Sequence, residues 1–211
     1  MEGIFWESGY RNNQPLHDFL MRSLPQASSE WKKKAYVSAI DANDGLYYSF
    51  GLHEYSDLSK SVDAVVGSAA MPFVFPPKKF TMDDGSVLDL MDGGSTWNNN
   101  MVPAIEDCLA KEGIDSYSQI EVDIIVLSPW EMSTYGGSTD NALDYYNRMK
   151  DIRGFYQDTA DVAEFMKAFP DLNFRYFFQP DKEVLPQLSI MSFDYETTTR
   201  PLFDRAHVDA Q

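Results

Sequence analysis

One acidic residue of this chain stands where α/β proteins place groups that do chemistry. Residues 87–91 form a short, mainly apolar run that ends abruptly in Asp92, Gly93 and Gly94. A side chain at the end of a strand faces the crevice outside the sheet, where α/β folds bind their ligands. Glycines tolerate a positive φ and a close backbone approach, so this turn can hold the carboxylate clear of the sheet. The pattern predicts that the Asp92 carboxylate faces this crevice and is available there for chemistry on a ligand. The simpler interpretation is a turn carboxylate that caps the helix after it.

A second segment strengthens the first interpretation. Residues 67–77 read Gly-Ser-Ala-Ala-Met-Pro-Phe-Val-Phe-Pro-Pro. Together the two segments resemble the second half of the patatin-like phospholipase domain, which has an Ala-Ser-x-Ala-x-Pro-x-x-Phe-Pro-Pro run, a strand, and then Asp-Gly-Gly or Asp-Gly-Ala. Asn98 falls where that family places an Asn. Gly67 stands where the family usually has Ala, and Asn100 where it usually has Pro.

The resemblance covers roughly residues 1–110 and is only an outline over 120–211. It implies a lipid acyl hydrolase that cleaves carboxylic esters of phospholipids or acylglycerols with a Ser–Asp dyad and no metal or organic cofactor. Asp92 would be the general base, and Gly93 and Gly94 would form the turn that positions it. The dyad needs no histidine, and the histidines here lie in no motif. We expect surface or packing roles for His17, His53 and His207.

The nucleophile of that family is missing from this sequence. It sits in Gly-x-Ser-x-Gly, a tight elbow between strand and helix, and no such pentapeptide occurs here. Ser8 has Trp6 and Tyr10 at the two glycine positions. The Gly-rich loop that builds the oxyanion hole is also missing, and one lost oxyanion donor costs about 2.7–4 kcal/mol of transition-state stabilisation. We therefore expect no hydrolysis by this chain alone.

Three explanations of the missing nucleophile stay open. The chain is the C-terminal piece of a longer enzyme, or it pairs with a second chain that supplies the Ser. The third explanation is a non-catalytic relative that serves as a structural or lipid-binding subunit. The sequence does not tell which lipid or which ester position is cut, or in which compartment.

Length and charge limit the function classes. The 211 residues, 44% hydrophobic, are enough for one domain over 1–211. The formal net charge of -16 disfavours binding to nucleic acids and to anionic surfaces, because it repels them at long range.

Peripheral contact with a membrane stays open as a hypothesis, through the basic run Lys32, Lys33 and Lys34 beside Trp31. The plainer interpretation is that this run is simply solvated. The single cysteine, Cys108, excludes an intrachain disulfide, and no signal peptide or membrane-spanning run is recognisable.

Helical and extended patterns alternate along the chain, which predicts an α/β fold. Turn signals at residues 43–45 and 84–85 predict two hairpins. We expect strands at 35–40, 46–50, 87–91, 122–127 and 174–178, and helices over 14–24, 58–65, 101–109, 142–156, 162–169 and from 199. A loop and helix start is expected at 136–140. The strand at 122–127 is nearly all apolar, which predicts cover on both faces.

The predicted architecture is a three-layer α/β/α sandwich with a mostly parallel, patatin-like sheet. The resemblance implies that it is incomplete at the N-terminal side, because the missing part supplies central strands. A parallel sheet that lacks its central strands would expose apolar strand edges.

Three further patterns have plain interpretations. Residues 41–45 resemble a calcium loop, but the spacing of Gly and Glu does not fit, so we expect a turn. The acids at 83, 84, 89 and 92 should be separated by the hairpin rather than hold calcium. The aromatic clusters at 73–75 and 176–178 are expected in the core rather than in an acyl-chain pocket.

Overall fold

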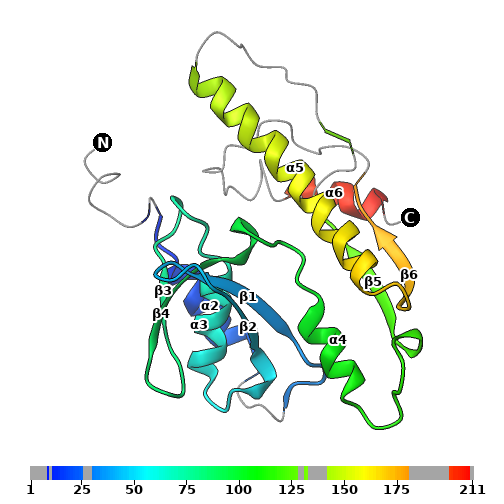
Figure 1. The fold of residues 1–211 in the computed structure, drawn as a ribbon. Coiled ribbons are helices and arrows are strands. Elements are labelled where there is room, and N and C mark those ends of the chain that lie inside the picture. The colour runs from blue at the N-terminus through cyan, green and yellow to red at the C-terminus, as the bar shows by residue number, and fades with distance from the viewer. Residues whose placement is uncertain are drawn as a thin grey trace. The chain divides into compact units, whose positions relative to one another are not determined.

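The computed structural model describes residues 9, 11–25, 30–127, 131–132, 142–180 and 200–209. The fold is mixed α/β and divides into two compact units, residues 1–108 and 109–211 (Figure 1). The boundary falls close to the point where the family resemblance fades. Ser8, which was considered above as a nucleophile, and the loop and helix start expected at 136–140 lie outside the described residues.

The first unit contains a four-stranded sheet in the order β2-β1-β4-β3, with every neighbouring pair antiparallel. Its strands are β1 (Tyr36–Asp41), β2 (Tyr47–Gly51), β3 (Lys78–Thr81) and β4 (Val87–Asp92). The two predicted hairpins are confirmed. Gly45 and Gly85 hold their turns at φ values of 74° and 86°, a conformation that glycine adopts without strain.

The prediction of a mostly parallel sheet is wrong for this unit. A parallel pair needs a crossover of a dozen or more residues. Residues 42–46 and 82–86 are tight turns that join only antiparallel neighbours. The central pair, β1 with β4, is antiparallel as well.

Two helices pack on one side of this sheet. The helix α3 (Leu58–Ser68) lies against the strands, and α2 (Gln14–Ser23) packs on α3 (Figure 1). Asp57 begins α3 because its carboxylate accepts a hydrogen bond from the Ser59 N–H at 2.9 Å. Pro15 lies in the first turn of α2, as predicted. The predicted helix near 101–109 is α4 (Val102–Leu109).

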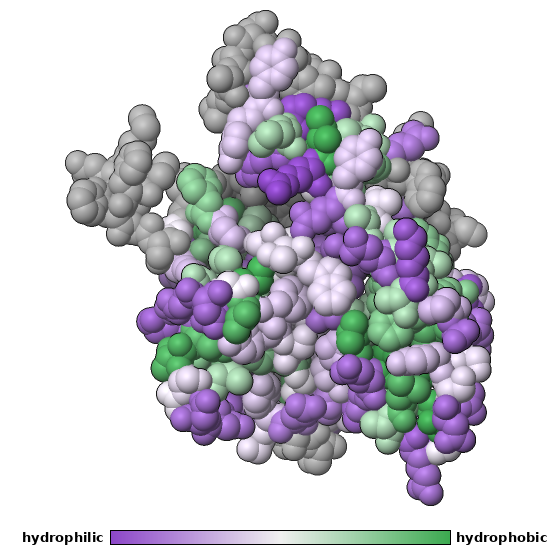
Figure 2. Space-filling model, in the orientation of Figure 1, coloured by the Kyte–Doolittle hydropathy of each residue, from purple (hydrophilic) through white to green (hydrophobic). Residues whose placement is uncertain are grey.

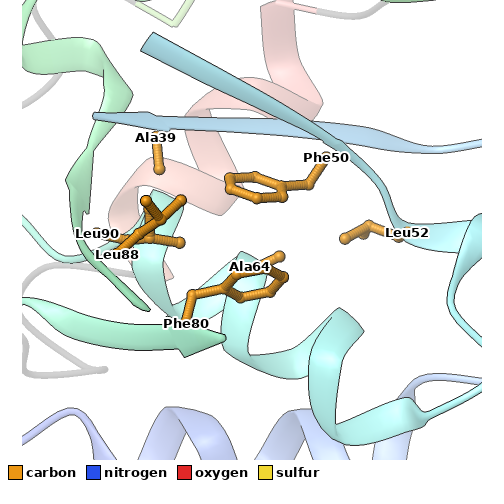
Figure 3. Close-up of a cluster of buried hydrophobic side chains, with 7 residues drawn as sticks. All are labelled: Ala39, Phe50, Leu52, Ala64, Phe80, Leu88 and Leu90. Carbon is orange, nitrogen blue, oxygen red and sulfur yellow. The ribbon is translucent and has the colours of Figure 1, made fainter. Parts of the chain in front are cut away.

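The core of the first unit lies between α3 and the sheet. Side chains from the four strands, the turn after β2 and α3 converge there (Figure 3). They are Ala39, Phe50, Leu52, Ala64, Phe80, Leu88 and Leu90. The rings of Phe50 and Phe80 are tilted, with centroids 4.8 Å apart. On α3, Gly67 faces Leu90 so closely that an added Cβ would lie 2.7 Å from the Leu90 Cβ. Gly67 therefore permits the short distance between α3 and β4.

The outer strands of this sheet are β2 and β3. On β3, Lys78 Nζ lies 2.7 Å from Asp63 Oδ1 and Lys79 Nζ lies 2.8 Å from Asp89 Oδ1. Charged residues on an outer strand discourage pairing with other chains. The apolar edge expected from a truncated sheet is therefore not found at β3.

The second unit is built around two parallel strands and one long helix. The strands β5 (Glu121–Ile125) and β6 (Asn173–Phe178) are connected through α5 (Ala142–Ala168). The sequence predicted two helices where α5 is continuous, because the mainly polar residues 157–161 interrupt the apolar pattern without breaking the helix. The helix ends two residues before Pro170, as predicted. The helix α6 (Arg200–Asp209) follows near the end of the chain.

The small sheet of this unit is covered on one face. On β5, Val122 and Ile124 are buried, while Asp123 is exposed and Ile125 is 67% exposed. The prediction of a strand covered on both faces is therefore wrong. The expected core position of residues 176–178 is also wrong, since these three side chains are 46–55% exposed. Successive side chains of a strand point to opposite faces. One-sided cover therefore describes β5, whereas over residues 176–178 neither face of β6 is fully covered.

The surface is mixed, in keeping with the net charge of -16. Figure 2 shows hydrophilic atoms over much of the visible face, with smaller hydrophobic patches between them. Among the described residues, no helix combines the length and hydrophobicity needed to cross a membrane.

The contact between Gly67 and Leu90 gives a stability prediction. Gly67→Ala places a methyl group against a side chain that is fully buried, so we expect a loss of about 1–3 kcal/mol of unfolding free energy. Urea unfolding followed by circular dichroism measures it. Gly154→Ala is the matched control, because no atom lies within 4 Å of its added Cβ and alanine stabilises a helix interior by roughly 0.5–1 kcal/mol. Equal effects of the two substitutions would refute the close contact.

Candidate functional site

The structure brings the two segments of the sequence pattern together at Asp92. Asp92 is the last residue of β4 and pairs with Ala39 of β1. Its backbone N–H donates to the Ala70 carbonyl at 3.0 Å. Ala70 follows the C-terminal end of α3, so a single hydrogen bond joins residues 67–77 to the acid. The site therefore combines residues that are far apart in the sequence.

The Asp92 carboxylate is half-buried and accepts a hydrogen bond from one donor among the described residues. Its Oδ1 accepts the Gly94 N–H at 2.9 Å and so caps the short helix η3 (Gly93–Ser95). Burial raises the pKa of Asp92 above the usual range, and the Gly94 bond opposes that rise. Among the described residues, no Lys, Arg or His forms an ion pair with it. A carboxyl in this setting favours its protonated form more than a surface acid does.

The two glycines after Asp92 act through close packing. Neither has a positive φ, so that part of the sequence argument is wrong. A Cβ on Gly93 would lie 2.7 Å from the Ser38 carbonyl oxygen, and one on Gly94 would lie 2.7 Å from the Asn98 Oδ1. Gly93 therefore meets fixed backbone, whereas Gly94 meets the end of a side chain.

Polar contacts fix the residues after the glycines against β1 and β2. The Tyr47 hydroxyl donates to the Trp97 carbonyl at 2.7 Å. The Asn100 amide donates to the hydroxyls of Ser38, at 3.2 Å, and Ser49, at 2.8 Å. Asn100 stands where the resembled family usually has Pro, which cannot donate such bonds. This cluster of two hydroxyls and one amide could not be predicted from the sequence, because Ser38 and Asn100 are 62 positions apart.

Phe73 is the strained residue of the site. Among the described residues it is the one non-glycine with a positive φ, at 73°, and its side chain is 60% exposed. Such a conformation costs on the order of 1–3 kcal/mol and is held only by its surroundings. The next residue, Val74, is fully buried, and its carbonyl accepts the Arg11 N–H at 2.7 Å. The cluster at 73–75 is therefore split between core and surface, contrary to the expectation of core alone.

No hydroxyl reaches Asp92 within the described part of the chain. Ser68 ends α3 and Ser95 lies exposed in η3, and neither is hydrogen-bonded to the carboxylate. The histidines have the roles expected of them. His17 Nε2 lies 3.8 Å from Asp63 Oδ1, His53 packs edge-on against Tyr36, and His207 is exposed.

The neighbouring acids each have their own partner. Asp83 pairs with Lys60, Asp84 accepts from Ser86, and Asp89 accepts from Lys79 and Asn43. The hairpin separates them, as predicted. Residues 41–45 form a turn in which the buried Asp41 accepts the Asp89 N–H at 2.8 Å. Within the described ranges, no three potential ligands gather to hold a metal ion.

No protein-family model matches the chain, and no curated protein is found to match it. The geometry around Asp92 is therefore the basis for any functional proposal.

The setting of Asp92 predicts its titration. Because the folded-state pKa is raised, folding favours the protonated acid, and this stabilisation is lost as pH rises through the folded pKa. Asp92→Asn keeps an acceptor for Gly94, so we expect it to be more stable than the parent at pH 7. The difference should disappear in acid. Urea unfolding at several pH values, with a ¹³C titration of the carboxyl, measures both.

Asp89→Asn is the matched control on the same strand. Hydrogen bonds from Lys79 and Asn43 lower the pKa of Asp89. Its stabilisation is present above the unfolded pKa and is lost as pH falls, so this variant should be less stable at pH 7. Effects of the same sign at both positions would contradict the assigned environments.

The two glycines should differ in tolerance. Gly93→Ala forces a methyl group against the Ser38 backbone, which cannot move without shifting β1, so we expect a loss of about 1–3 kcal/mol. Gly94→Ala meets the ends of two side chains, Asn98 Oδ1 at 2.7 Å and Asp92 Oδ1 at 3.2 Å, rather than backbone, and should cost less than half as much. Thermal unfolding of both variants measures the difference, and the reverse order would show that the turn packs differently.

Proposed function

We propose that this chain supplies the general base of a lipid acyl hydrolase that cleaves carboxylic esters, within a three-layer patatin-like α/β/α fold. The observation that carries the proposal is the state of Asp92. It is a half-buried carboxylate at a strand end, without a cation partner in the described residues, and it is bonded through its backbone to Ala70. Phosphoglycerides and acylglycerols are the substrate class that the family resemblance implies.

The proposed chemistry needs a serine that this chain does not provide in an elbow. A second chain or a segment outside this sequence supplies it. As the serine Oγ attacks the ester carbonyl, its proton passes to the free Oδ2 of Asp92, since Oδ1 holds the Gly94 N–H. Asp92 then protonates the leaving alcohol. Water then attacks the acyl-serine and gives a proton to Asp92, which passes it to the departing serine Oγ as the carboxylic acid is released. No metal or organic cofactor takes part.

The raised pKa suits this task. A general base works best when its pKa lies near the operating pH. Burial moves Asp92 in that direction, whereas an adjacent Lys or Arg would move it away. The half-buried setting also strengthens the hydrogen bond that Asp92 would make to the serine.

The alternative is a non-catalytic structural or lipid-binding protein. One observation favours it: the Asp92 carboxylate caps η3, which a purely structural acid would also do. Under this alternative Asp92 matters for the loop and not for turnover.

The deciding experiment measures hydrolysis of a chromogenic short-chain ester. The full chain alone should show none. The coding sequence upstream of Met1, or another gene of the same genome, should encode a Gly-rich loop and Gly-x-Ser-x-Gly within roughly one domain's length, about 150 residues. The chain supplied with that part should hydrolyse the ester. Asp92→Asn should lower the rate by about 10²–10⁴-fold, and Asp89→Asn should leave it within twofold.

Two results would refute the proposal. Turnover that survives Asp92→Asn would remove Asp92 from the mechanism. The second result has two components. No segment or chain that carries Gly-x-Ser-x-Gly gives turnover with this chain, and the 211-residue chain unfolds cooperatively by itself. Together they would favour the non-catalytic alternative.

A further inference from the structure

A pocket of about 450 Å³ lies within the second unit, between α5 and the small parallel sheet. This volume is in the range of small-molecule sites, which are mostly apolar with few polar groups. Its inner wall is Ile124 and Val126, which are buried. The outer wall includes Ala163 and Met166 of α5 and Tyr176 and Phe177 of β6.

The outer wall exposes apolar side chains that a folded protein normally covers. Tyr176 is 55% exposed, Phe177 46% and Met166 41%. A ligand that covers this apolar surface and removes it from water is stabilised in proportion to the area covered. A contiguous apolar surface that is exposed to solvent around a pocket is typical of a binding site.

The charges around the pocket select among apolar ligands. Among the described lining residues, Arg175 is the one basic side chain. Its guanidinium is already held by Asp123, at 2.6 and 3.0 Å, and by Glu121, at 2.8 Å. It also lies over the Tyr176 ring, 5.2 Å from the centroid. Asp158 adds a negative charge to the lining. Within the described part of the lining, a fatty-acid anion therefore finds no cation that is not already paired, and the net charge of -16 repels it further.

We propose that this pocket binds the aliphatic chain of an uncharged lipid, such as a monoacylglycerol. The unbranched chain fills the apolar hollow, and the uncharged head group lies at the rim near Asp158 and Thr159. Thr159 donates its hydroxyl hydrogen to the Phe155 carbonyl at 3.0 Å, which leaves its oxygen as an acceptor for a lipid hydroxyl. The site is separate from Asp92 and does not rest on the proposed ester chemistry.

The test is a calorimetric titration of the full chain with 1-monolauroylglycerol and with laurate, both below their micelle concentrations. We expect saturable binding of the monoacylglycerol, with a negative heat-capacity change, about tenfold tighter than laurate. Ala163→Trp fills the pocket from an exposed position on α5 and should weaken binding at least tenfold. Ala160→Trp is the matched control, because Ala160 is also exposed on α5 but does not line the pocket. It should bind within twofold of the parent.

A further variant separates the remaining outcomes. Met166→Lys places a cation at the pocket and should tighten laurate binding. The proposal is overturned by absence of saturable binding, by equal effects of the two tryptophan substitutions, or by laurate binding as tightly as the neutral lipid. It is also overturned if sedimentation shows a dimer that Ala163→Trp dissociates, since the pocket would then be a surface for self-association.

Discussion

The close approach of α3 to β4 is the constraint on which the candidate site depends. Gly67 lets the helix come so near that its missing Cβ would collide with Leu90. Because α3 ends one residue later, the chain leaves it beside the end of β4, where the Ala70 carbonyl meets the Asp92 N–H. A wider separation of α3 and β4 would break the bond between Asp92 and Ala70 and expose the Asp92 carboxylate to solvent. The helix contact thus controls the burial of Asp92 and, through burial, its pKa.

Two physical effects compete at Asp92, and their balance separates the two functions considered for this chain. The cap to Gly94 stabilises the ionised form, while burial destabilises it. A structural cap is best served by a solvated carboxylate with a low pKa, as at Asp84, whose pKa is lowered by bonds from Ser86. Burial of Asp92 weakens the cap and improves the base. A role as proton acceptor explains why the fold keeps this destabilising burial of Asp92. A role as a cap alone does not explain it.

Local features of this fold could be predicted from the sequence, and non-local ones could not. The hairpins follow from Asn43-Asp44-Gly45 and Asp84-Gly85, because a turn is specified by the few residues within it. The pairing of β1 with β4 joins residues separated by two other strands, and no local pattern encodes its direction. The exposure of Tyr176 could not be predicted for a similar reason. An apolar strand has the same sequence pattern whether one of its faces is covered or both are. At the site, Asp92 was found from its glycines, but Asn100 and the positive φ of Phe73 carry no sequence signature.

The two units share an electrostatic property that narrows the substrate class. Asp92 has no cation beside it in the described part of the chain, and Arg175 is neutralised by Asp123 and Glu121. An anionic phosphate or carboxylate head group would find attraction at neither place and would meet the field of a chain with net charge -16. A neutral ester pays no such electrostatic cost, and its aliphatic part gains from apolar burial. Within the proposed function, acylglycerols therefore fit these charges better than anionic phospholipids do.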